Sequence, residues 1–491
     1  MSLVKRVPHW LWVLAAILAL RLVLMATFPL TDNSEPRYAE IARLMAETGD
    51  WITPWFEPGV PFWGKPPLAF WMSALSFKLL GYGDFAARLP TWLATIAILC
   101  LIHGFARSQF NDKAARLAVL IYATCFLSFL SAGAVLTDAY LTLAITLSLS
   151  AFGRLAQSPS RVWGHAFFCG LALGMLAKGP LALVLVFGVV FVWLLWRRRW
   201  DGLRRLPWIS GTLLFLALTL PWYVLAELKT PGFLKYFLVG EHFYRFVDPG
   251  WHGDLYGTAH QRAYGSIWLD SLLAAFPWGL LALWQLLRWK PSGKRLREAL
   301  HPSGDPRTAY LLSWTLAAPA LFTFSGNILW TYAQPSLPAF SILLAASLLK
   351  GRADAHSRPA WNTLMALTPC AGIVLGSLAM AYPERLRTEK HLVAYYTEHA
   401  QRDQPLYYLG TPPFSARYYS HEQVQSYPAH NPLDELNRHP SGIYLAVGHA
   451  DPAALKNLVL SPVLFKNRRY SLVFAKAKNS GQTSLLMDAN K

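Results

Sequence analysis

Four charged residues that could take part in a reaction follow the first apolar segment of this 491-residue chain, within the stretch 31–67. Asp32, Glu35 and Arg37 come first, and Lys65 follows directly before two prolines. A carboxylate can remove the proton from a hydroxyl nucleophile, whereas lysine and arginine can neutralise a phosphate. Because ionisable groups are costly to hold at a membrane boundary, their presence there indicates a functional site.

Two other places in the chain carry residues of the same types. Asp138 lies in the apolar context AVLTDAYL, and His242 and Arg245 lie in EHFYRF. A sugar that leaves a phosphate carrier needs a base for the acceptor and cations for the departing phosphate, and these residues supply both. Structural roles are the alternatives: a helix-end charge for Asp32, first-turn charges for Glu35 and Arg37, a snorkelling lysine for Lys65, a structural acid for Asp138, and a hydrogen-bonded loop histidine for His242.

Membrane helices must position these residues. The chain is 54% hydrophobic and only 15% charged, against about 25% charged in a typical soluble domain. Several apolar runs reach the roughly 20 residues that span a bilayer. The net charge of +18 comes mostly from short basic clusters between these runs, which is the positive-inside pattern. Nucleic acid is therefore not expected as a partner.

The four cysteines all lie in predicted spans and lack CxxC spacing, so neither disulfides nor a zinc ribbon is expected.

Hydropathy and loop charge predict about 11 spans, within limits of 10 to 13. The run that begins at Trp10 is long enough to be an uncleaved helix rather than a signal peptide. With the N-terminus inside, the basic clusters face the cytoplasm, and the loops 31–84 and 227–265 and the C-terminal tail face outward. The predicted spans are 8–30, 85–105, 116–134, 138–156, 163–180, 181–196, 207–226, 266–287, 309–325, 328–349 and 360–381.

The first outer loop contains two helical patterns that are too short to span. Ser34 is a suitable N-cap for the first, which carries an apolar stripe from Tyr38 to Met45 and stops at Gly49. The second runs from Pro67 to Leu80. We expect both, and a further helix in 227–265, to lie in the headgroup plane.

The composition changes at about residue 382, where short apolar or aromatic runs begin to alternate with turn residues. The sequence therefore predicts a polytopic α-helical membrane domain over 1–381, with the interfacial loops 31–84 and 227–265, and a small outer α/β domain over 382–491. The apolar or aromatic runs are Pro405–Leu409, Arg417–Tyr419, Ile443–Val447 and Tyr470–Phe474, and a helical patch lies near Ala453–Leu458.

The stretch EPRYAEIARLMAETGDWITPWFEPGVPFWGKPP resembles the aminoarabinose transferase branch of the polyprenyl-phosphate-dependent glycosyltransferases, which have a GT-C fold and are related to protein O-mannosyltransferases. The resemblance continues through LTDAYL, GMLAKGP, EHFYRF and NILWTYAQPSLPAF and covers about residues 10–350. It implies a bacterial inner-membrane enzyme whose active site and C-terminus face the periplasm.

The same resemblance implies an inverting transfer of a sugar from undecaprenyl phosphate by direct displacement. The acceptor would be an envelope molecule such as lipid A, another glycan or a protein. A membrane transporter or lipid flippase without transferase chemistry is the alternative, although such proteins often show repeated halves and broken helices, which the sequence does not display.

The family's functional residues map onto positions of this chain. The acidic pair falls on Asp32 and Glu35, and the second aspartate on Asp138. The family's phosphate-binding lysine falls on Lys65, and its arginine on Arg37. We expect Arg245, which the family mapping does not include, to bind the donor phosphate together with Lys65 and Arg37. The remaining substrate contacts fall on Tyr38, His242 and the lipid-side Tyr332.

This chain departs from the family pattern at two positions. The two acids are adjacent in the aminoarabinose enzymes, whereas here Ser34 precedes Glu35, so either Asp32 or Glu35 could be the base. Those enzymes also carry a glutamate before Lys-Pro-Pro that is associated with a bound metal together with a histidine resembling His242. Gly64 stands there in this chain. The sequence therefore assigns no metal ligands and no definite cofactor, and a divalent metal stays an open alternative.

Overall fold

The structure is a computed structural model that describes residues 8–198, 200–257, 260–288, 305–350, 357–427, 436, 438–448 and 459–476. The chain divides into two compact units. The first combines Met1–Thr27 with Ile41–Val374, and the second combines Phe28–Glu40 with Leu375–Lys491. The domain boundary at residue 382 stays a prediction. The helical patch predicted at 453–458 and parts of the basic clusters lie outside the described residues.

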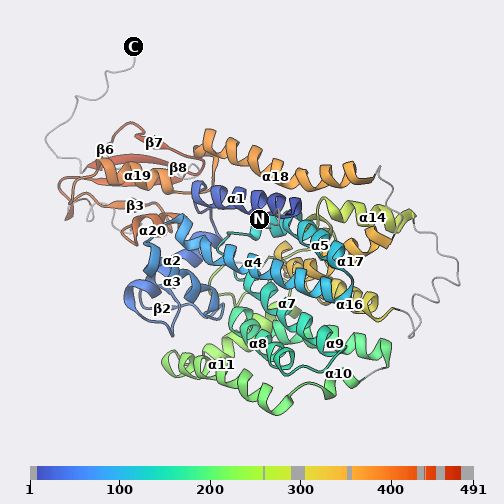
Figure 1. The fold of residues 1–491 in the computed structure, drawn as a ribbon. Helices are drawn as coiled ribbons and strands as arrows, with labels where there is room; N and C mark the ends of the chain where they lie inside the picture. The colour runs from blue at the N-terminus through green and yellow to red at the C-terminus, as the bar shows by residue number, and fades with distance from the viewer. Residues whose placement is uncertain are drawn as a thin grey trace, which may run out of the picture. The chain divides into compact units, whose positions relative to one another are not determined.

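The first unit is helical (Figure 1). Its one small hairpin, among the described residues, joins β1 (Trp55–Glu57) to β2 (Val60–Pro61). The helices are α1 (His9–Thr27), α3 (Leu68–Leu80), α4 (Asp84–Gln109), α5 (Asp112–Thr124), α6 (Phe126–Ser131), α7 (Asp138–Leu155), α8 (Arg161–Lys178), α9 (Leu181–Arg197), α10 (Asp201–Arg204), α11 (Trp208–Lys229), the π-helix η1 (Lys235–Tyr244), α12 (Arg245–Val247), α13 (Ser266–Ala274), α14 (Trp278–Arg288), α16 (Pro306–Phe322), the 3₁₀-helix η2 (Trp330–Ser336) and α17 (Leu337–Lys350).

Two helices, α2 (Ser34–Thr48) and α18 (Ser357–Ala381), extend across a boundary between the units, and α2 also lies in the predicted first outer loop. α2 begins at Ser34 and ends directly before Gly49, whose φ is 70°; a side chain disfavours that conformation, which makes glycine a natural stop. α2 and α3 confirm the two helices predicted in the first loop.

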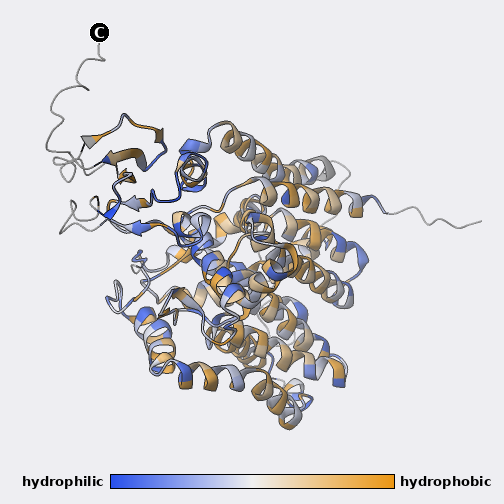
Figure 2. Ribbon diagram, turned by 90° about the vertical axis from the view of Figure 1, so that its left-hand side faces the viewer, coloured by the Kyte–Doolittle hydropathy of each residue, from blue (hydrophilic) through white to orange (hydrophobic). Residues whose placement is uncertain are grey.

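The apolar helices make this a multi-pass membrane protein. Within the described residues, five helices are long and apolar enough to cross a bilayer: α1, α4, α11, the η2–α17 segment Trp330–Lys350, and Ala360–Ala381 of α18. The bent pair α13–α14 would be a sixth. Figure 2 shows apolar residues along much of the helical part of the molecule. Several exposed positions on α11 are large and apolar, including Leu213, Leu216 and Leu220, as expected where lipid is the solvent.

Two predicted spans are broken rather than continuous. The predicted span 116–134 is divided at Cys125, between α5 and α6, and the predicted span 266–287 bends by 114° between α13 and α14. The two breaks lie against each other, because the Phe126 amide donates to the Phe276 carbonyl at 2.8 Å. Trp278 Nε1 also donates to Thr124 Oγ1 at 2.9 Å. Backbone groups freed at a break must find such partners inside a membrane protein.

Helices α7 and α8 pack tightly and antiparallel, which sets the position of the candidate site. Gly170 of α8 faces α7 so closely that a Cβ would collide with Ser148 Oγ, whereas a Cβ at Gly174 would collide with Ala182 of α9 and only touch Ala144 of α7. Small residues of this kind allow helix backbones to approach within a membrane. Because the helices are antiparallel, the start of α7 at Asp138 lies beside the end of α8 at Lys178.

The second unit contains a mixed sheet of six short strands in the described residues. The order is β4–β3–β5–β8–β6, and β7 also pairs with β8. β3 is parallel to β4 and β5, whereas β8 is antiparallel to β5, with Leu445 opposite Val473. The strands are β3 (Leu406–Tyr408), β4 (Gln425–Ser426), β5 (Ile443–Gly448), β6 (Val459–Leu460), β7 (Phe465–Lys466) and β8 (Tyr470–Lys476).

Helices η3 (Pro383–Arg385), α19 (Lys390–His399) and α20 (Phe414–Ser420) accompany this sheet. The run Arg417–Tyr419 lies in α20. Leu392, Leu406, Ala446 and Leu472 form part of the core beneath α19.

Candidate active site

Lys65 enters the site from the loop between β2 and α3. The two prolines that follow have fixed φ angles, which restrict the direction from which the lysine approaches. Its Nζ donates to Glu241 Oε2 at 3.1 Å and to the Gly64 carbonyl at 2.5 Å. The lysine side chain is 18% exposed and the Glu241 side chain only 4% exposed, so the ion pair closes one wall of the site.

Arg245 binds the same carboxylate from the other side. Its Nη1 donates to both oxygens of Glu241, at 3.0 and 3.1 Å, and lies 3.2 Å from Asp254 Oδ2. Asn327 fixes the backbone of this segment, because its Nδ2 donates to the carbonyls of Arg245 and Asp248 at 2.6 and 2.7 Å. The arginine is therefore held by its side chain and by its main chain.

The π-helix η1 places Glu241 and His242 next to each other at the site. His242 Nδ1 lies 2.7 Å from the Phe237 carbonyl, five residues earlier, and its Nε2 lies 3.0 Å from the Lys178 carbonyl. Single turns of π-helix occur frequently at functional sites. His242 thus connects η1 to the end of α8, which carries the next cation.

Lys178 and Asp138 form a buried ion pair where α7 meets α8. Lys178 Nζ donates to Asp138 Oδ1 at 2.6 Å, and the two side chains are 7% and 9% exposed. The ammonium group also lies 4.5 Å from the centre of the Tyr332 ring. An isolated charge would be very costly at this depth, so each partner requires the other.

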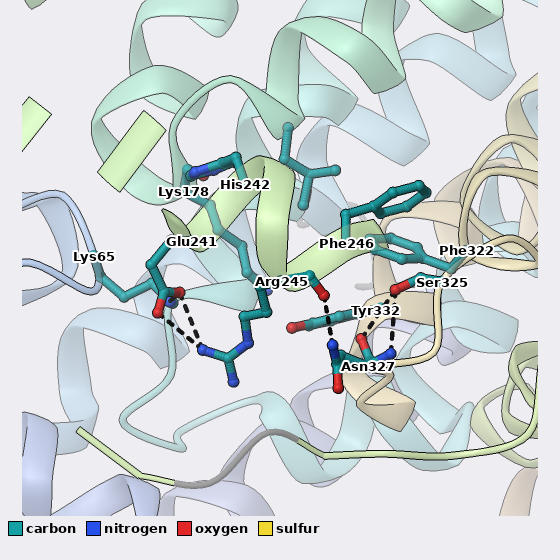
Figure 3. Close-up of a pocket in the computed structure, with 11 residues that line it drawn as sticks. Lys65, Lys178, Glu241, His242, Arg245, Phe246, Phe322, Ser325, Asn327 and Tyr332 are labelled. Carbon is teal, nitrogen blue, oxygen red and sulfur yellow. Dashed lines mark hydrogen bonds and ion pairs between the residues drawn. The ribbon is translucent and has the colours of Figure 1, made fainter. Parts of the chain in front are cut away.

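These side chains surround a cavity of about 80 Å³ (Figure 3). Asp138 and Asp254 are not among the lining residues, so they neutralise the cations from outside the cavity. Glu241 is the one carboxylate among the described residues that line it. The complete lining is Lys65, Lys178, Leu181, Glu241, His242, Arg245, Phe246, Phe322, Ser325, Asn327 and Tyr332. The cavity therefore presents three cations and one carboxylate.

The charges of this cluster reinforce one another. Burial acts to raise the pKa of the Glu241 carboxyl, but the charges of Lys65 and Arg245 outweigh it and hold this pKa below its usual range. Burial lowers the pKa of His242, although its two carbonyl contacts act in the opposite direction. Glu241 is thus ionised at neutral pH and keeps the two cations oriented. Such a cationic cavity can bind a phosphate.

The acidic residues predicted in the first loop belong to the second unit. Asp32 accepts from the Ser415 amide at 2.9 Å and from Arg469 Nη2 at 2.6 Å. The Arg37 guanidinium lies over the rings of Tyr38 and Phe414, at 5.1 and 5.5 Å. Glu35 begins α2 as a first-turn acid.

The structure thus brings Lys65, His242, Arg245 and Tyr332 to one cavity, and joins Asp138 to it through Lys178. Asp32, Glu35, Arg37 and Tyr38 are part of the other unit. The roles assigned to all these residues stay predictions.

Three of the cavity residues that sequence reasoning missed hold its charged groups in place: Lys178, Glu241 and Asn327. Lys178 lies in GMLAKGP, where a lysine ending an apolar run was the available signal. Glu241 directly precedes the predicted His242. Asn327 gave no signal, because it acts through two backbone carbonyls of a distant segment.

The residues around His242 do not fit a bound metal. Both ring nitrogens face carbonyl oxygens, at 2.7 and 3.0 Å, so neither is directed at an open position for a metal ion. At Gly64, where the related enzymes carry a glutamate, a Cβ would lie 2.9 Å from Phe62 Cζ. Over the described part of the chain, no group of three His, Cys, Asp or Glu residues is arranged to hold a metal ion.

Comparison with known proteins relates this arrangement to a family. Residues 10–237 match the family described as dolichyl-phosphate-mannose-protein mannosyltransferase. An undecaprenyl phosphate-alpha-4-amino-4-deoxy-L-arabinose arabinosyl transferase of Edwardsiella ictaluri is 30% identical over 350 residues, which are 70% of this chain and 59% of that protein. Its counterpart from Aeromonas salmonicida is 32% identical over 368 residues, 72% and 63% of the two chains. The match thus spans about three fifths of the length of these relatives.

Solved structures share the fold. Crystalline ArnT from Cupriavidus metallidurans bound to undecaprenyl phosphate has a TM-score of 0.72 at 18% identity, covering 94% of this chain and 97% of that one. The Archaeoglobus fulgidus oligosaccharyltransferase has a TM-score of 0.52 at 10% identity, covering 91% and 70%. The family match, the sequence relatives and the shared fold together show that the chain belongs to the protein mannosyltransferase family of GT-C membrane glycosyltransferases.

Proposed function

We propose that this protein is an inverting glycosyltransferase that moves a sugar from undecaprenyl phosphate, or a similar polyprenyl phosphate, to an acceptor in the bacterial envelope. The observation that carries the proposal is the cavity in which Lys65, Lys178 and Arg245 meet beside Tyr332. A phosphate that leaves a sugar gains negative charge, and preoriented cations stabilise that charge. The relatives named above, which are transferases that use undecaprenyl phosphate-linked aminoarabinose, support the class of donor.

The proposed reaction is a single displacement. The acceptor hydroxyl attacks the anomeric carbon on the face opposite the phosphate, and the bond between that carbon and the phosphate oxygen breaks. The carrier leaves as polyprenyl phosphate with the bonding electrons, and the hydroxyl proton passes to a carboxylate, Asp32 or Glu35. In this proposal Lys65, Arg245 and Arg37 bind the donor phosphate, while Asp138 assists by holding Lys178 in place.

Substrate contacts complete the assignment. Tyr332 carries Lys178 over its ring and lines the cavity, so we assign it to the carrier side of the donor. We assign His242 to orienting Lys178, whose backbone carbonyl it contacts. Tyr38 is assigned to substrate binding beside Arg37. Lipid A is one acceptor that fits the proposal, and another glycan or a protein fits it equally.

We also propose about 11 spans rather than the six that length and apolarity support. α7 and α8 have many buried residues, among them Thr142 and Thr146 of α7 and Gly170 of α8. Helices that are surrounded by other helices need no apolar face toward lipid, which lowers their mean hydropathy without excluding them from the membrane. The active site and the C-terminus would then face the periplasm of a bacterial inner membrane, as the basic loops require.

The test compares envelope lipids and glycans by mass spectrometry from cells with and without the gene. The gene is supplied as wild type, as Lys65→Ala, or as Lys78→Ala, all at equal membrane abundance. Lys78 is a matched control, because it lies in the last turn of α3 and does not line the cavity. We expect one envelope component to lose a sugar mass without the gene or with Lys65→Ala, and to keep it with Lys78→Ala. Solute flux without any gene-dependent sugar transfer would favour a transporter or flippase instead.

A further inference from the structure

Asp32 is one of the two acids expected to act as the base. Both of its carboxylate oxygens are bound by the part of its own unit that begins at Leu375, which we call the C-terminal module. Oδ1 accepts from the Ser415 amide at 2.9 Å, and Oδ2 accepts from Ser415 Oγ at 2.5 Å and from Arg469 Nη2 at 2.6 Å. The Asp32 side chain is only 1% exposed. Three donors therefore occupy a carboxylate that water barely reaches.

Arg469 joins Asp32 to a second buried carboxylate, Glu389. Its Nη2 and Nε donate to Glu389 Oε1 at 2.7 and 3.2 Å, and the Glu389 side chain is fully buried. Asn467 Nδ2 donates to the other oxygen, Oε2, at 2.8 Å. One arginine thus bridges two buried acids, and removing it would leave both of them uncompensated.

The C-terminal module also holds the backbone around Asp32. The Asp32 amide donates to the Arg387 carbonyl at 2.8 Å, and Thr388 Oγ1 donates to the Leu30 carbonyl at 2.8 Å. The Leu30 amide donates to Tyr419 Oη at 2.7 Å. Side-chain and main-chain contacts together fix residues 30–32 directly before α2 begins at Ser34.

A general base needs a carboxylate within hydrogen-bond reach of the acceptor hydroxyl. Asp32 offers almost no accessible surface for such a contact, and three of the roughly four accepting positions of its carboxylate are already in use. Glu35 follows in the first turn of α2 and is partly exposed. The direction of that helix, and thus the position of Glu35, depends on the anchored residues before it.

We propose that Asp32 is a positioning residue, bound by Arg469 and Ser415 of the C-terminal module, and that this anchor sets the position of Glu35, which is the base. The assignment of Glu35 rests on the proposed glycosyl transfer, whereas the anchor does not. The C-terminal module then has a specific role in the reaction beyond serving as an outer domain.

The anchor is tested by hydrogen exchange followed by mass spectrometry on the full-length protein in lipid nanodiscs. The variants are Arg469→Met, Asp32→Asn, the double variant, and Arg468→Met. Arg468 is a matched control, because it is the neighbouring arginine and, within the described residues, its side chain donates one exposed hydrogen bond, to the Arg385 carbonyl at 3.5 Å. Exchange is read in peptides that cover residues 28–40, with peptides around Lys65 as the internal reference.

We expect Arg469→Met and Asp32→Asn each to accelerate exchange of residues 28–40 by about tenfold, with no change around Lys65. The double variant should exchange no faster than the faster single variant, because both changes remove the same contact. Arg468→Met should match the wild type. Ser415→Ala provides a milder variant should Arg469→Met fail to fold. Unchanged exchange of residues 28–40 in Asp32→Asn and Ser415→Ala would overturn the anchor.

The role of Glu35 is tested in membranes of the producing cells, with their endogenous donor and acceptor, by following the gene-dependent product across pH. Glu35→Gln should abolish transfer. Asp32→Asn and Arg469→Met should each lower the rate by about tenfold, non-additively, and keep the acid limb of the wild-type pH profile. Complete loss of transfer in Asp32→Asn, with wild-type exchange of residues 28–40, would make Asp32 the base and refute the proposal.

The two experiments separate the two claims. If wild-type membranes form no gene-dependent product, the glycosyl transfer fails, and with it the role of Glu35. The exchange measurement still decides whether Arg469 anchors Asp32.

Discussion

Lys178 Nζ, in the last turn of α8, lies 2.6 Å from Asp138 Oδ1, in the first turn of α7, and both side chains are more than nine-tenths buried. Antiparallel packing of α7 and α8 brings together two charges that are 40 residues apart in the chain. This pair holds a cation against the cavity wall while its counter-charge stays outside the cavity. The following expectations depend on that arrangement and on the contacts around it.

Breaking this ion pair is expected to destabilise the protein strongly. Lys178→Ala leaves the Asp138 carboxylate buried without its partner, at a cost of about 3–5 kcal/mol in the free energy of unfolding. The double variant Asp138→Leu with Lys178→Met should recover most of that stability while transfer stays absent. Denaturation in detergent measures the free energy, and Lys78→Ala is the control. An undiminished stability of Lys178→Ala would show that the charge is not buried as described.

The Tyr332 ring is expected to matter more than its hydroxyl. Tyr332→Phe keeps an aromatic face beneath the Lys178 ammonium, so binding of undecaprenyl phosphate should change by less than about threefold. Tyr332→Ala removes a contact worth about 2 kcal/mol when desolvated, which should weaken binding by roughly tenfold or more. Native mass spectrometry with added undecaprenyl phosphate compares the variants. Equal weakening in the two variants would assign the effect to the hydroxyl instead.

The Glu241 carboxylate should give stability a defined pH dependence. Its pKa is lowered in the folded protein, because the charges of Lys65 and Arg245 outweigh the effect of burial. A lowered pKa means that the carboxylate contributes stability above its unfolded pKa of about 4.3 and loses it as pH falls through the folded value. The deficit of Glu241→Gln relative to wild type should be constant from about pH 6 to 8 and shrink below about pH 4.3. Thermal unfolding across pH measures it, and a deficit that grows toward acid would contradict the ion pair.

The close approach of α7 and α8 predicts a contrast between two glycines. Gly170→Val places a side chain where Ser148 already lies, so we expect a loss of about 1–3 kcal/mol or more and low abundance in the membrane. Gly188→Val in α9 adds the same group where nothing lies within 4 Å of the new Cβ, so it should be tolerated. Immunoblots of membranes and thermal unfolding compare the two. Similar losses in both would show that helix propensity, rather than packing, sets the effect.

Local pattern was sufficient for much of the helical architecture and for part of the site. Helix α2 could be predicted because Ser34 begins an apolar stripe that Gly49 ends, and α3 because its pattern follows two prolines. Lys65, His242 and Arg245 were recognisable as polar residues in unusual settings at the membrane boundary. The breaks at Cys125 and between α13 and α14 could not be predicted, because apolar residues continue through both and only their mutual hydrogen bonds reveal them.

The sequence by itself determined the membrane class, the family and the residue types that can bind a phosphate, since hydropathy and motifs are local properties of the chain. Tertiary structure decided which charges meet. It placed Glu241 between Lys65 and Arg245, and Lys178 beside Asp138. It also bound Asp32 to Arg469, 437 residues away. The sequence spacing of such distant residues does not indicate that they meet, because their proximity arises only when the helices and the C-terminal sheet have packed.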